Sequence, residues 1–315
     1  MLRVLVTGGS GYLGSAIVRA LVRRGHRPIV FSRQPLTSHA DLAAIRGDLR
    51  SRADVESAVR QCDAVCHAGA LVSLWRRRSR DFDDVNVDGT RHVLEACRAR
   101  GVHRLIYTAS FLALPPAGRS TPLTLNDYQR TKVAALSLVR DRVTRGEPII
   151  VLVPGVVYGP GPATEGNLVS RLLRDHFAGR LPGIVGGDRQ WSFAWVEDVA
   201  QAHVSALERG DIGAEYAVGG ENASPMRMFE VARAVTGRSL PRRLPTTLVR
   251  LAGAAEEIRA RIGGPPPLVT RGAVDIFSHD WPLDSRRAVA DLGYAPRALE
   301  SGLRAVLDTL DGQSS

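Results

Sequence analysis

One stretch decides the fold of this 315-residue chain: Thr7-Gly8-Gly9-Ser10-Gly11-Tyr12-Leu13-Gly14. It follows an apolar run, Arg3–Thr7, and opens an amphipathic helical pattern, Tyr12–Arg24. The glycines at 8, 11 and 14 allow a tight turn and let the backbone approach a ligand closely, while the N-terminus of the helix offers N–H groups to anionic oxygens. Strand, glycine loop and helix in this order predict a site for the pyrophosphate of a dinucleotide.

The segments that follow repeat the alternation of strand and helix. Residues 104–109 and 148–153 are apolar over several consecutive positions, as expected for strands buried on both faces. Alternating elements joined by right-handed crossovers predict an α/β fold with a doubly wound parallel Rossmann sheet. The expected strands are 3–7, 28–32, 44–47, 64–67, 104–109 and 148–153, and the expected helices are 12–24, 52–61, 81–100 and 126–145.

The texture of the sequence changes after Pro154, where glycine and proline become frequent and predict a loop that leaves the sheet. We therefore expect a Rossmann dinucleotide-binding domain over residues 1–154 and a smaller C-terminal α+β substrate-binding lobe over most of 155–315. Segments near 189–218 are expected to return to the first domain. Helices are predicted at 167–178, 196–208, 225–236, 246–262 and 298–310, and a strand at 215–218.

The ends of the second and third strands carry information on the cofactor. Folds that favour NAD usually place an acidic residue at the end of the second strand, to hold the ribose hydroxyls, but this chain has Arg33. A guanidinium there predicts NADP, through its 2′-phosphate; the alternative is NAD with Arg33 as a surface residue. Asp48, followed by Leu49, could accept a hydrogen bond from the adenine amino group, or it could cap the helix expected from residue 52.

Lys132 is the only lysine among 42 basic residues. An ammonium is a compact point charge that arginine cannot replace, so this position indicates a specific need for it. Lys132 follows Tyr128 by four residues, which puts both side chains on one face of the helix 126–145.

The chain resembles the extended short-chain dehydrogenases/reductases, the NAD-dependent epimerase/dehydratase superfamily. The similarity covers nearly the whole chain and is closest in look to the dihydroflavonol reductase and 3β-hydroxysteroid dehydrogenase branch. The motifs that carry it, in family order, are the glycine loop, Gly47-Asp48-Leu49, His67-Ala68-Gly69-Ala70, Asn86-Val87-Asp88-Gly89-Thr90, Thr108-Ala109-Ser110, Tyr128-Gln129-Arg130-Thr131-Lys132, Pro154-Gly155-Val156-Val157-Tyr158-Gly159 and Asp291-Leu292-Gly293-Tyr294.

The resemblance implies a catalytic group of Ser110, Tyr128 and Lys132. Tyr128 would act as general acid/base, with its pKa lowered by Lys132 and the nicotinamide, and Ser110 would orient the substrate oxygen. Lys132 would also hold the nicotinamide ribose. The implied cofactor contacts are Gly8, Ser10, Gly11, Tyr12, Leu13, Gly14, Arg33, Asp48, Leu49, Ala68, Gly69, Ala70, Tyr128, Lys132, Pro154, Val156 and Val157.

Three functions compete. The first is an NAD(P)-dependent oxidoreductase that moves a hydride between nicotinamide and the carbonyl or alcohol of a small hydrophobic substrate, which could lie on Phe111-Leu112-Ala113-Leu114. The second is a sugar-nucleotide epimerase with tightly bound NAD. The third is a non-catalytic regulator that senses dinucleotides, although such relatives typically lose the tyrosine–lysine pair, which is intact here.

The composition predicts a small-molecule substrate as the partner and gives no sign of binding to nucleic acid. The formal charge is +10, but the arginines are interspersed with acids and form no nucleic-acid motif. The three cysteines have no metal-ligand spacing, no apolar run is long enough for a membrane span, and no leader segment is evident, so a cytoplasmic enzyme without a metal is expected; a homodimer is compatible with the sequence. Two features stay open: Arg76-Arg77-Arg78 with Arg80 is a solvated face or a binding patch, and the amphipathic stretch 246–262 packs in the lobe or touches a membrane surface.

Overall fold

A seven-stranded parallel sheet forms the centre of the molecule. The computed structural model describes residues 1–34, 42–161 and 164–311. The strand order is β3-β2-β1-β4-β5-β6-β9, and all six neighbouring pairs are parallel. The predicted α/β class with a doubly wound Rossmann sheet is confirmed. The strands are β1 (Arg3–Thr7), β2 (Arg27–Ser32), β3 (Ala43–Arg46), β4 (Ala64–His67), β5 (Leu105–Thr108), β6 (Ile149–Pro154) and β9 (Glu215–Val218).

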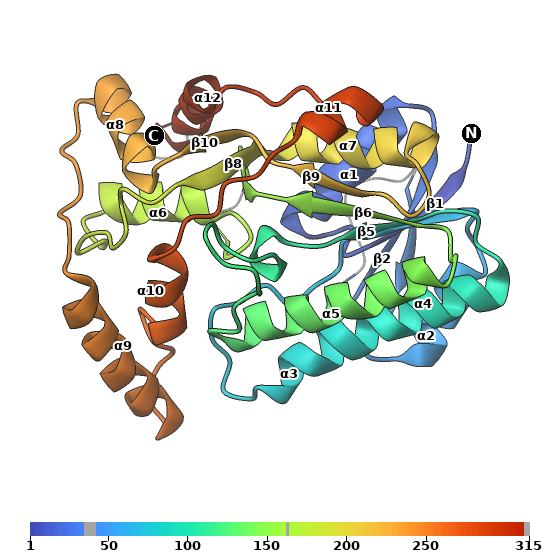
Figure 1. Ribbon diagram of the computed structural model, residues 1–315, viewed down its shortest axis with the longest axis horizontal. Coiled ribbons are helices and arrows are strands. Elements are labelled where there is room, and N and C mark those ends of the chain that lie inside the picture. Colours follow the sequence, from blue (N-terminus) through green and yellow to red (C-terminus); the bar gives the residue numbers. More distant parts are fainter. Residues whose placement is uncertain (35–41, 162–163, 312–315) are drawn as a thin grey trace.

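Helices cover both faces of this sheet (Figure 1). One face packs against α1 (Tyr12–Arg23), α7 (Val196–Arg209) and α11 (Arg286–Leu292), the other against α2 (Arg52–Val59), α4 (Gly89–Arg100) and α5 (Asp127–Thr144). Strand β1 shows why both layers are needed: Val4 and Val6 belong to the first core, whereas Leu5, between them, belongs to the second. Apolar side chains on both sides of a strand force a three-layer fold.

A second lobe is built on a three-stranded sheet of order β10-β8-β7. Its own core joins this sheet to α6, α8, α10 and α12. The lobe elements are β7 (Val156–Tyr158), α6 (Leu168–Phe177), β8 (Trp191–Trp195), β10 (Glu221–Ala223), α8 (Pro225–Thr236), α9 (Thr246–Arg261), α10 (Arg271–Phe277) and α12 (Leu299–Asp311). Helix α7 and strand β9 pack with the large sheet, although they lie between lobe elements in the chain. The domain boundary at residue 154 stays a prediction.

Two segments differ from the sequence-based expectation. The helix expected over 81–100 is interrupted: α3 (Arg80–Phe82) runs into a π-helical segment, η1 (Asp83–Asp88), before α4 begins. The glycine- and proline-rich segment after Pro154, expected to be a loop, contains β7. Gly155 permits this, because a Cβ there would lie 2.3 Å from the carbonyl oxygen of Ser192, which belongs to the neighbouring strand (Trp191–Trp195).

Candidate active site

A cavity of about 410 Å³ opens where the parallel strands β1, β4, β5 and β6 end. This is the edge at which doubly wound sheets bind their ligands. Every site residue predicted from the sequence lines it, which brings together segments up to about 150 residues apart in the chain. These residues are Gly8, Ser10, Gly11, Tyr12, Leu13, Gly14, Arg33, Asp48, Leu49, Ala68, Gly69, Ala70, Ser110, Tyr128, Lys132, Pro154, Val156 and Val157. Their roles in binding and catalysis stay predictions.

Two positions of the glycine loop, Gly8 and Gly14, have no room for a side chain. Gly8 has a φ of +70°, and a Cβ on it would lie 2.6 Å from the Cα of Gly69. A Cβ on Gly14 would lie 2.0 Å from the carbonyl oxygen of Gly8. Gly11 is the N-cap of helix α1. Because it has no side chain, the first backbone N–H groups of the helix are not capped by one. The cradle therefore fits the anionic pyrophosphate of a dinucleotide.

The ends of β2 and β3 carry charges of opposite sign. Arg33 is exposed at the cavity and has no ion pair within the described part of the chain. Asp48 pairs with Arg50 at 2.6 Å, and this hydrogen-bonded guanidinium lowers the pKa of the carboxyl group. The alternative of Asp48 as a helix cap is wrong, because Ser51 caps α2 by accepting a hydrogen bond from the backbone N–H of Asp54 at 3.2 Å.

Lys132 lies almost completely inside the protein. Its ammonium donates a hydrogen bond to the carbonyl oxygen of Thr108 at 3.0 Å, and only 5% of the residue is exposed. Burial lowers the pKa of Lys132 to about 8. This hydrogen bond holds the side chain of Lys132 against the end of β5, and Thr108 is two residues before Ser110 in the chain.

Tyr128 differs from the expectation. Burial raises the pKa of Tyr128 to about 12, and the hydroxyl group of Ser110 beside it acts in the opposite direction. The lowering by Lys132 that the resemblance implied is not seen in the protein by itself, because desolvation of the phenolate is the larger effect. In this state Tyr128 holds its proton and is a donor at neutral pH.

Two amides that sequence reasoning left without a role brace helix α5, which carries Tyr128 and Lys132. Gln129 is fully buried; its amide donates to the carbonyl oxygen of Leu112 at 3.2 Å, and its amide oxygen accepts from the N–H of Leu125 at 3.1 Å. It thereby ties α5 to the segment after Ser110, whose hydroxyl caps the short 3₁₀ helix Phe111–Ala113. Gln129 and the second amide, Asn86, each belong to one of the family motifs quoted above, but only their contacts in the structure show what they do.

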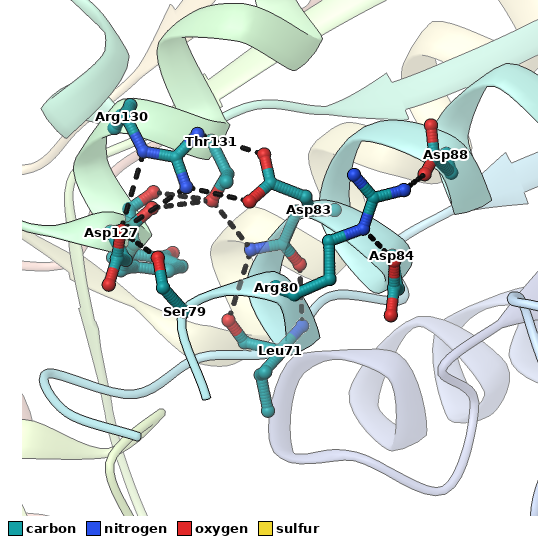
Figure 2. A network of polar contacts seen from close by, with 11 residues as sticks. Leu71, Ser79, Arg80, Asp83, Asp84, Asp88, Asp127, Arg130 and Thr131 are labelled. Atoms are coloured by element: carbon teal, nitrogen blue, oxygen red, sulfur yellow. Dashed lines mark hydrogen bonds and ion pairs between the residues drawn. The ribbon is translucent and has the colours of Figure 1, made fainter. Parts of the chain in front are cut away.

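Asn86 makes the second brace, from the π-helical segment. Its amide accepts from the N–H of Leu71 at 2.7 Å and donates to the carbonyl of Leu71 at 3.2 Å and the hydroxyl of Thr131 at 3.1 Å. Figure 2 shows this cluster, together with the ion pair between Arg130 and Asp83 at 2.7 Å. The π-helical segment thus joins the loop after β4, which lines the cavity, to helix α5.

A buried histidine links the same loop to the glycine loop. The hydroxyl of Thr90 donates to the carbonyl of Asn86 at 2.7 Å, so it accepts from Nε2–H of His67 at 3.1 Å. Nδ1 of His67 then accepts from the hydroxyl of Thr7 at 2.6 Å, and Thr7 accepts from the N–H of Gly69 at 3.2 Å. Burial lowers the pKa of His67 to about 3, so the ring stays neutral. The donor and the acceptor of each hydrogen bond in this chain are therefore fixed, and the chain holds the loops after β1 and β4 in place relative to each other.

The substrate end of the cavity is mostly apolar and comes largely from segments that the sequence did not single out. Of the predicted segment Phe111–Leu114, only Phe111 and Leu112 line it, because Ala113 and Leu114 turn into the core beneath α5. Arg171 of α6 is half-buried on the wall and has no ion pair among the described residues. The remaining wall includes Leu71, Val72, Ser73, Leu74, Val85, Glu165, Leu168, Trp191, Ala273, Ile276 and Phe277.

The fold, the glycine cradle and the cavity at the ends of the strands define a dinucleotide-binding enzyme of the Rossmann class. Residues 4–219 match the NAD dependent epimerase/dehydratase family, and the chain belongs to that family. It is an NAD(P)-dependent oxidoreductase of the extended short-chain dehydrogenase/reductase type. In the described part of the chain, no helix is long and apolar enough to cross a membrane, and no three His, Cys, Asp or Glu side chains gather as metal ligands.

Relatives with named activities are similar over nearly their full length. The chain is 31% identical to 2-alkyl-3-oxoalkanoate reductase from Stenotrophomonas maltophilia, with 96% of this chain and 98% of that protein covered. It is 30% identical to 3-beta-hydroxysteroid dehydrogenase from Mycolicibacterium neoaurum, covering 93% and 87% of the two chains. Among solved structures, MoeE5 in complex with UDP-glucuronic acid and NAD is 26% identical, with a TM-score of 0.77 and 99% of each chain covered.

Proposed function

We propose that the protein is an NADP-dependent reductase or dehydrogenase that moves a hydride between nicotinamide and the carbonyl or alcohol of a small hydrophobic substrate. The observation that carries the proposal is that Ser110, Tyr128 and Lys132 line the same cavity as the glycine cradle. A proton donor, an orienting hydroxyl and an ammonium beside a dinucleotide site are the groups that carbonyl reduction requires.

Tyr128 would act as general acid in the direction of reduction, and its raised pKa agrees with this because the phenol keeps its proton at neutral pH. A reduced nicotinamide, when bound, would supply the hydride. The phenol of Tyr128 would give its proton to the carbonyl oxygen on which negative charge develops. The Ser110 hydroxyl donates a hydrogen bond to the same oxygen. Lys132, held by Thr108, stabilises the phenolate left on Tyr128 and binds the ribose.

The apolar lining of the cavity supports an apolar substrate. Leu74, Phe111, Ile276 and Phe277 line it together with Trp191, and such side chains gain more from covering hydrocarbon than from covering a polyhydroxylated sugar. The reductase and hydroxysteroid dehydrogenase names of the relatives agree with this substrate class.

NADP is the cofactor that the end of β2 favours. Arg33 and Ser10 both line the cavity, and Arg33 makes no ion pair among the described residues, although its charge helps to lower the pKa of Asp48. A hydrogen bond to a charged group contributes about 1.5–3 kcal/mol, so a 2′-phosphate on Arg33 should favour NADPH over NADH by roughly 10- to 100-fold.

Epimerisation of a sugar nucleotide is the second candidate. It is favoured by the similarity to MoeE5, which was solved with UDP-glucuronic acid and NAD. The guanidinium of Arg171 could hold a diphosphate at the wall of the cavity. A non-catalytic regulator is not proposed, because the family and the named relatives are enzymes.

The test is a fluorescence titration with NADPH and NADH on the wild type, Arg33→Asp and Arg46→Asp. Arg46 is exposed on β3, so the second variant makes the same charge change outside the cavity. We expect NADPH to bind at least tenfold more tightly, a difference of about 1.4 kcal/mol, and only Arg33→Asp to lose this difference. A preference for NADH, or NAD retained through purification, would instead favour the epimerase, which turnover of UDP-sugars would then test.

A further inference from the structure

Helix α9 turns its large apolar side chains away from the protein. Leu248, Leu251, Ile258 and Ile262 are 63%, 70%, 62% and 82% exposed. Their spacing of three, seven and four residues places them on one face of the helix, and the exposed Ala252 and Ala255 lie between them. Leu268, in the segment after α9, is 89% exposed. Five of the eleven exposed large apolar residues in the described chain therefore fall within residues 248–268.

The buried face of α9 carries small or charged residues, whereas burial of its large apolar residues would have stabilised the protein more. Its buried residues are Gly253, Glu257 and Ala260, which pack toward α10. The carboxylate of Glu257 forms an ion pair with the guanidinium of Arg271 at 2.9 Å. Burying a leucine or isoleucine is worth about 1.5–3 kcal/mol, which this helix forgoes at several positions. Figure 1 shows α9 at the outer edge of the lobe, beside α10 and away from the large sheet. A contiguous apolar face of this kind marks an interaction site.

The basic cluster Arg76-Arg77-Arg78 lies at the C-terminal end of this helix. The guanidinium of Arg77 donates a hydrogen bond to the carbonyl oxygen of Ala260 at 3.2 Å. All three arginines are exposed, and so is Arg261 of α9; none of the four has an ion pair within the described residues. An unexplained positive cluster thus lies against the last turn of the helix that carries the unexplained apolar face. The contact residues Arg77 and Ala260 are 183 residues apart in sequence, and Ala260 belongs to the inward side of α9.

We propose that this surface, α9 with Arg76–Arg78, docks the protein on an anionic lipid bilayer. An amphipathic helix that lies in the headgroup region inserts its apolar face to a shallow depth, and neighbouring arginines bind the lipid phosphates. The charge argues against a second copy of the chain as the occupant, because pairing two copies would bring these uncompensated clusters toward one another in a protein of formal charge +10. The surface goes beyond the proposed reaction and does not depend on it. Helix α10 separates it from the cavity, which Ala273, Ile276 and Phe277 line.

The test is sedimentation of the full chain with vesicles of phosphatidylcholine, alone or mixed with phosphatidylglycerol, at low and high salt. We expect binding to the anionic vesicles only, weakened by salt. Leu251→Glu with Ile258→Glu should abolish it, and replacing Arg76, Arg77 and Arg78 by serine should weaken it on the order of a hundredfold. The matched controls are Val22→Glu with Val289→Glu, which change two exposed apolar residues elsewhere, and serine at Arg60, Arg98 and Arg100, which removes the same charge from another face.

Thermal unfolding and NADPH titration of each variant show whether it is folded, and the arginine variant provides an answer even if the glutamates disturb the helix. Wild-type protein that binds neither kind of vesicle would overturn the proposal, and so would equal binding by test and control variants. If sedimentation velocity shows a dimer that the two glutamates convert to a monomer, with no vesicle binding by either form, the face is a self-interface and the proposal is wrong.

Discussion

Replacing Lys132 by methionine should abolish activity and yet make the folded protein more stable at neutral pH. Methionine has a similar length and no charge to desolvate. Only 5% of Lys132 is exposed. Two contacts compensate its ammonium among the described residues: the hydrogen bond to the carbonyl of Thr108, and the ring of Tyr107, whose centroid lies 5.3 Å away. The chain keeps a group there that its own fold disfavours, as active sites commonly do.

The magnitude follows from the pKa. Burial lowers the pKa of Lys132 from 10.5 to about 8, and 10.5 − 8 = 2.5 units correspond to about 3 kcal/mol. Because the unfolded chain binds the proton more tightly, this cost is fully present below pH 8 and disappears as the pH rises from 8 to 10.5. Loss of the hydrogen bond to Thr108 offsets about 1–2 kcal/mol of the gain. The net expectation is a variant about 1–2 kcal/mol more stable at pH 7.

Urea unfolding followed by tryptophan fluorescence at pH 7 and pH 9.5 checks this. The wild type should gain about 2 kcal/mol from this group between the two values, so the advantage of Lys132→Met should vanish or reverse at pH 9.5. Lys132→Arg is the control, because a guanidinium stays charged at both values and cannot escape the cost. The reasoning is refuted if Lys132→Met is the less stable protein at pH 7, or if its difference from the wild type is the same at both pH values.

Other substitutions give outcomes of different kinds. Tyr128→Phe should lower kcat by about 10²- to 10⁴-fold and leave the Kd for NADPH within a few-fold, as single-turnover rates and titration can show; an unchanged kcat would remove Tyr128 as the proton donor. Gly14→Ala should destabilise the fold by about 1–3 kcal/mol and prevent cofactor binding, since its Cβ would meet backbone atoms of Gly8; Gly11→Ala, whose Cβ would lie at 3.1 Å, should be milder in thermal unfolding, and equal effects would contradict the geometry. Asn86→Ala should cost about 1–3 kcal/mol in urea unfolding and lower kcat more than it raises KM, because it frees the loop after β4 from helix α5; an effect on stability alone would make it merely structural.

The Rossmann half of the molecule was readable from the sequence because its signals are local. The strands predicted at 3–7 and 64–67 have the observed ends, and α5 begins one residue after the predicted start at 126. Alternating apolar runs, a glycine loop and helix caps act over a few residues, so they survive in the sequence as patterns. The π-helical segment and the short α10 and α11 were not predicted, since one or two turns give too little periodicity.

The sequence by itself determined the glycine cradle, the single lysine four residues after Tyr128, and the arginine, in place of an acidic residue, at position 33. Each of these depends on which residue stands at one position of a recognisable pattern. Only the tertiary structure decided the part of the cavity wall that comes from α6 and α10, the raised pKa of Tyr128, and the contact of Arg77 with the C-terminal end of α9. Desolvation and long-range contacts depend on which segments pack together, and no local pattern records that.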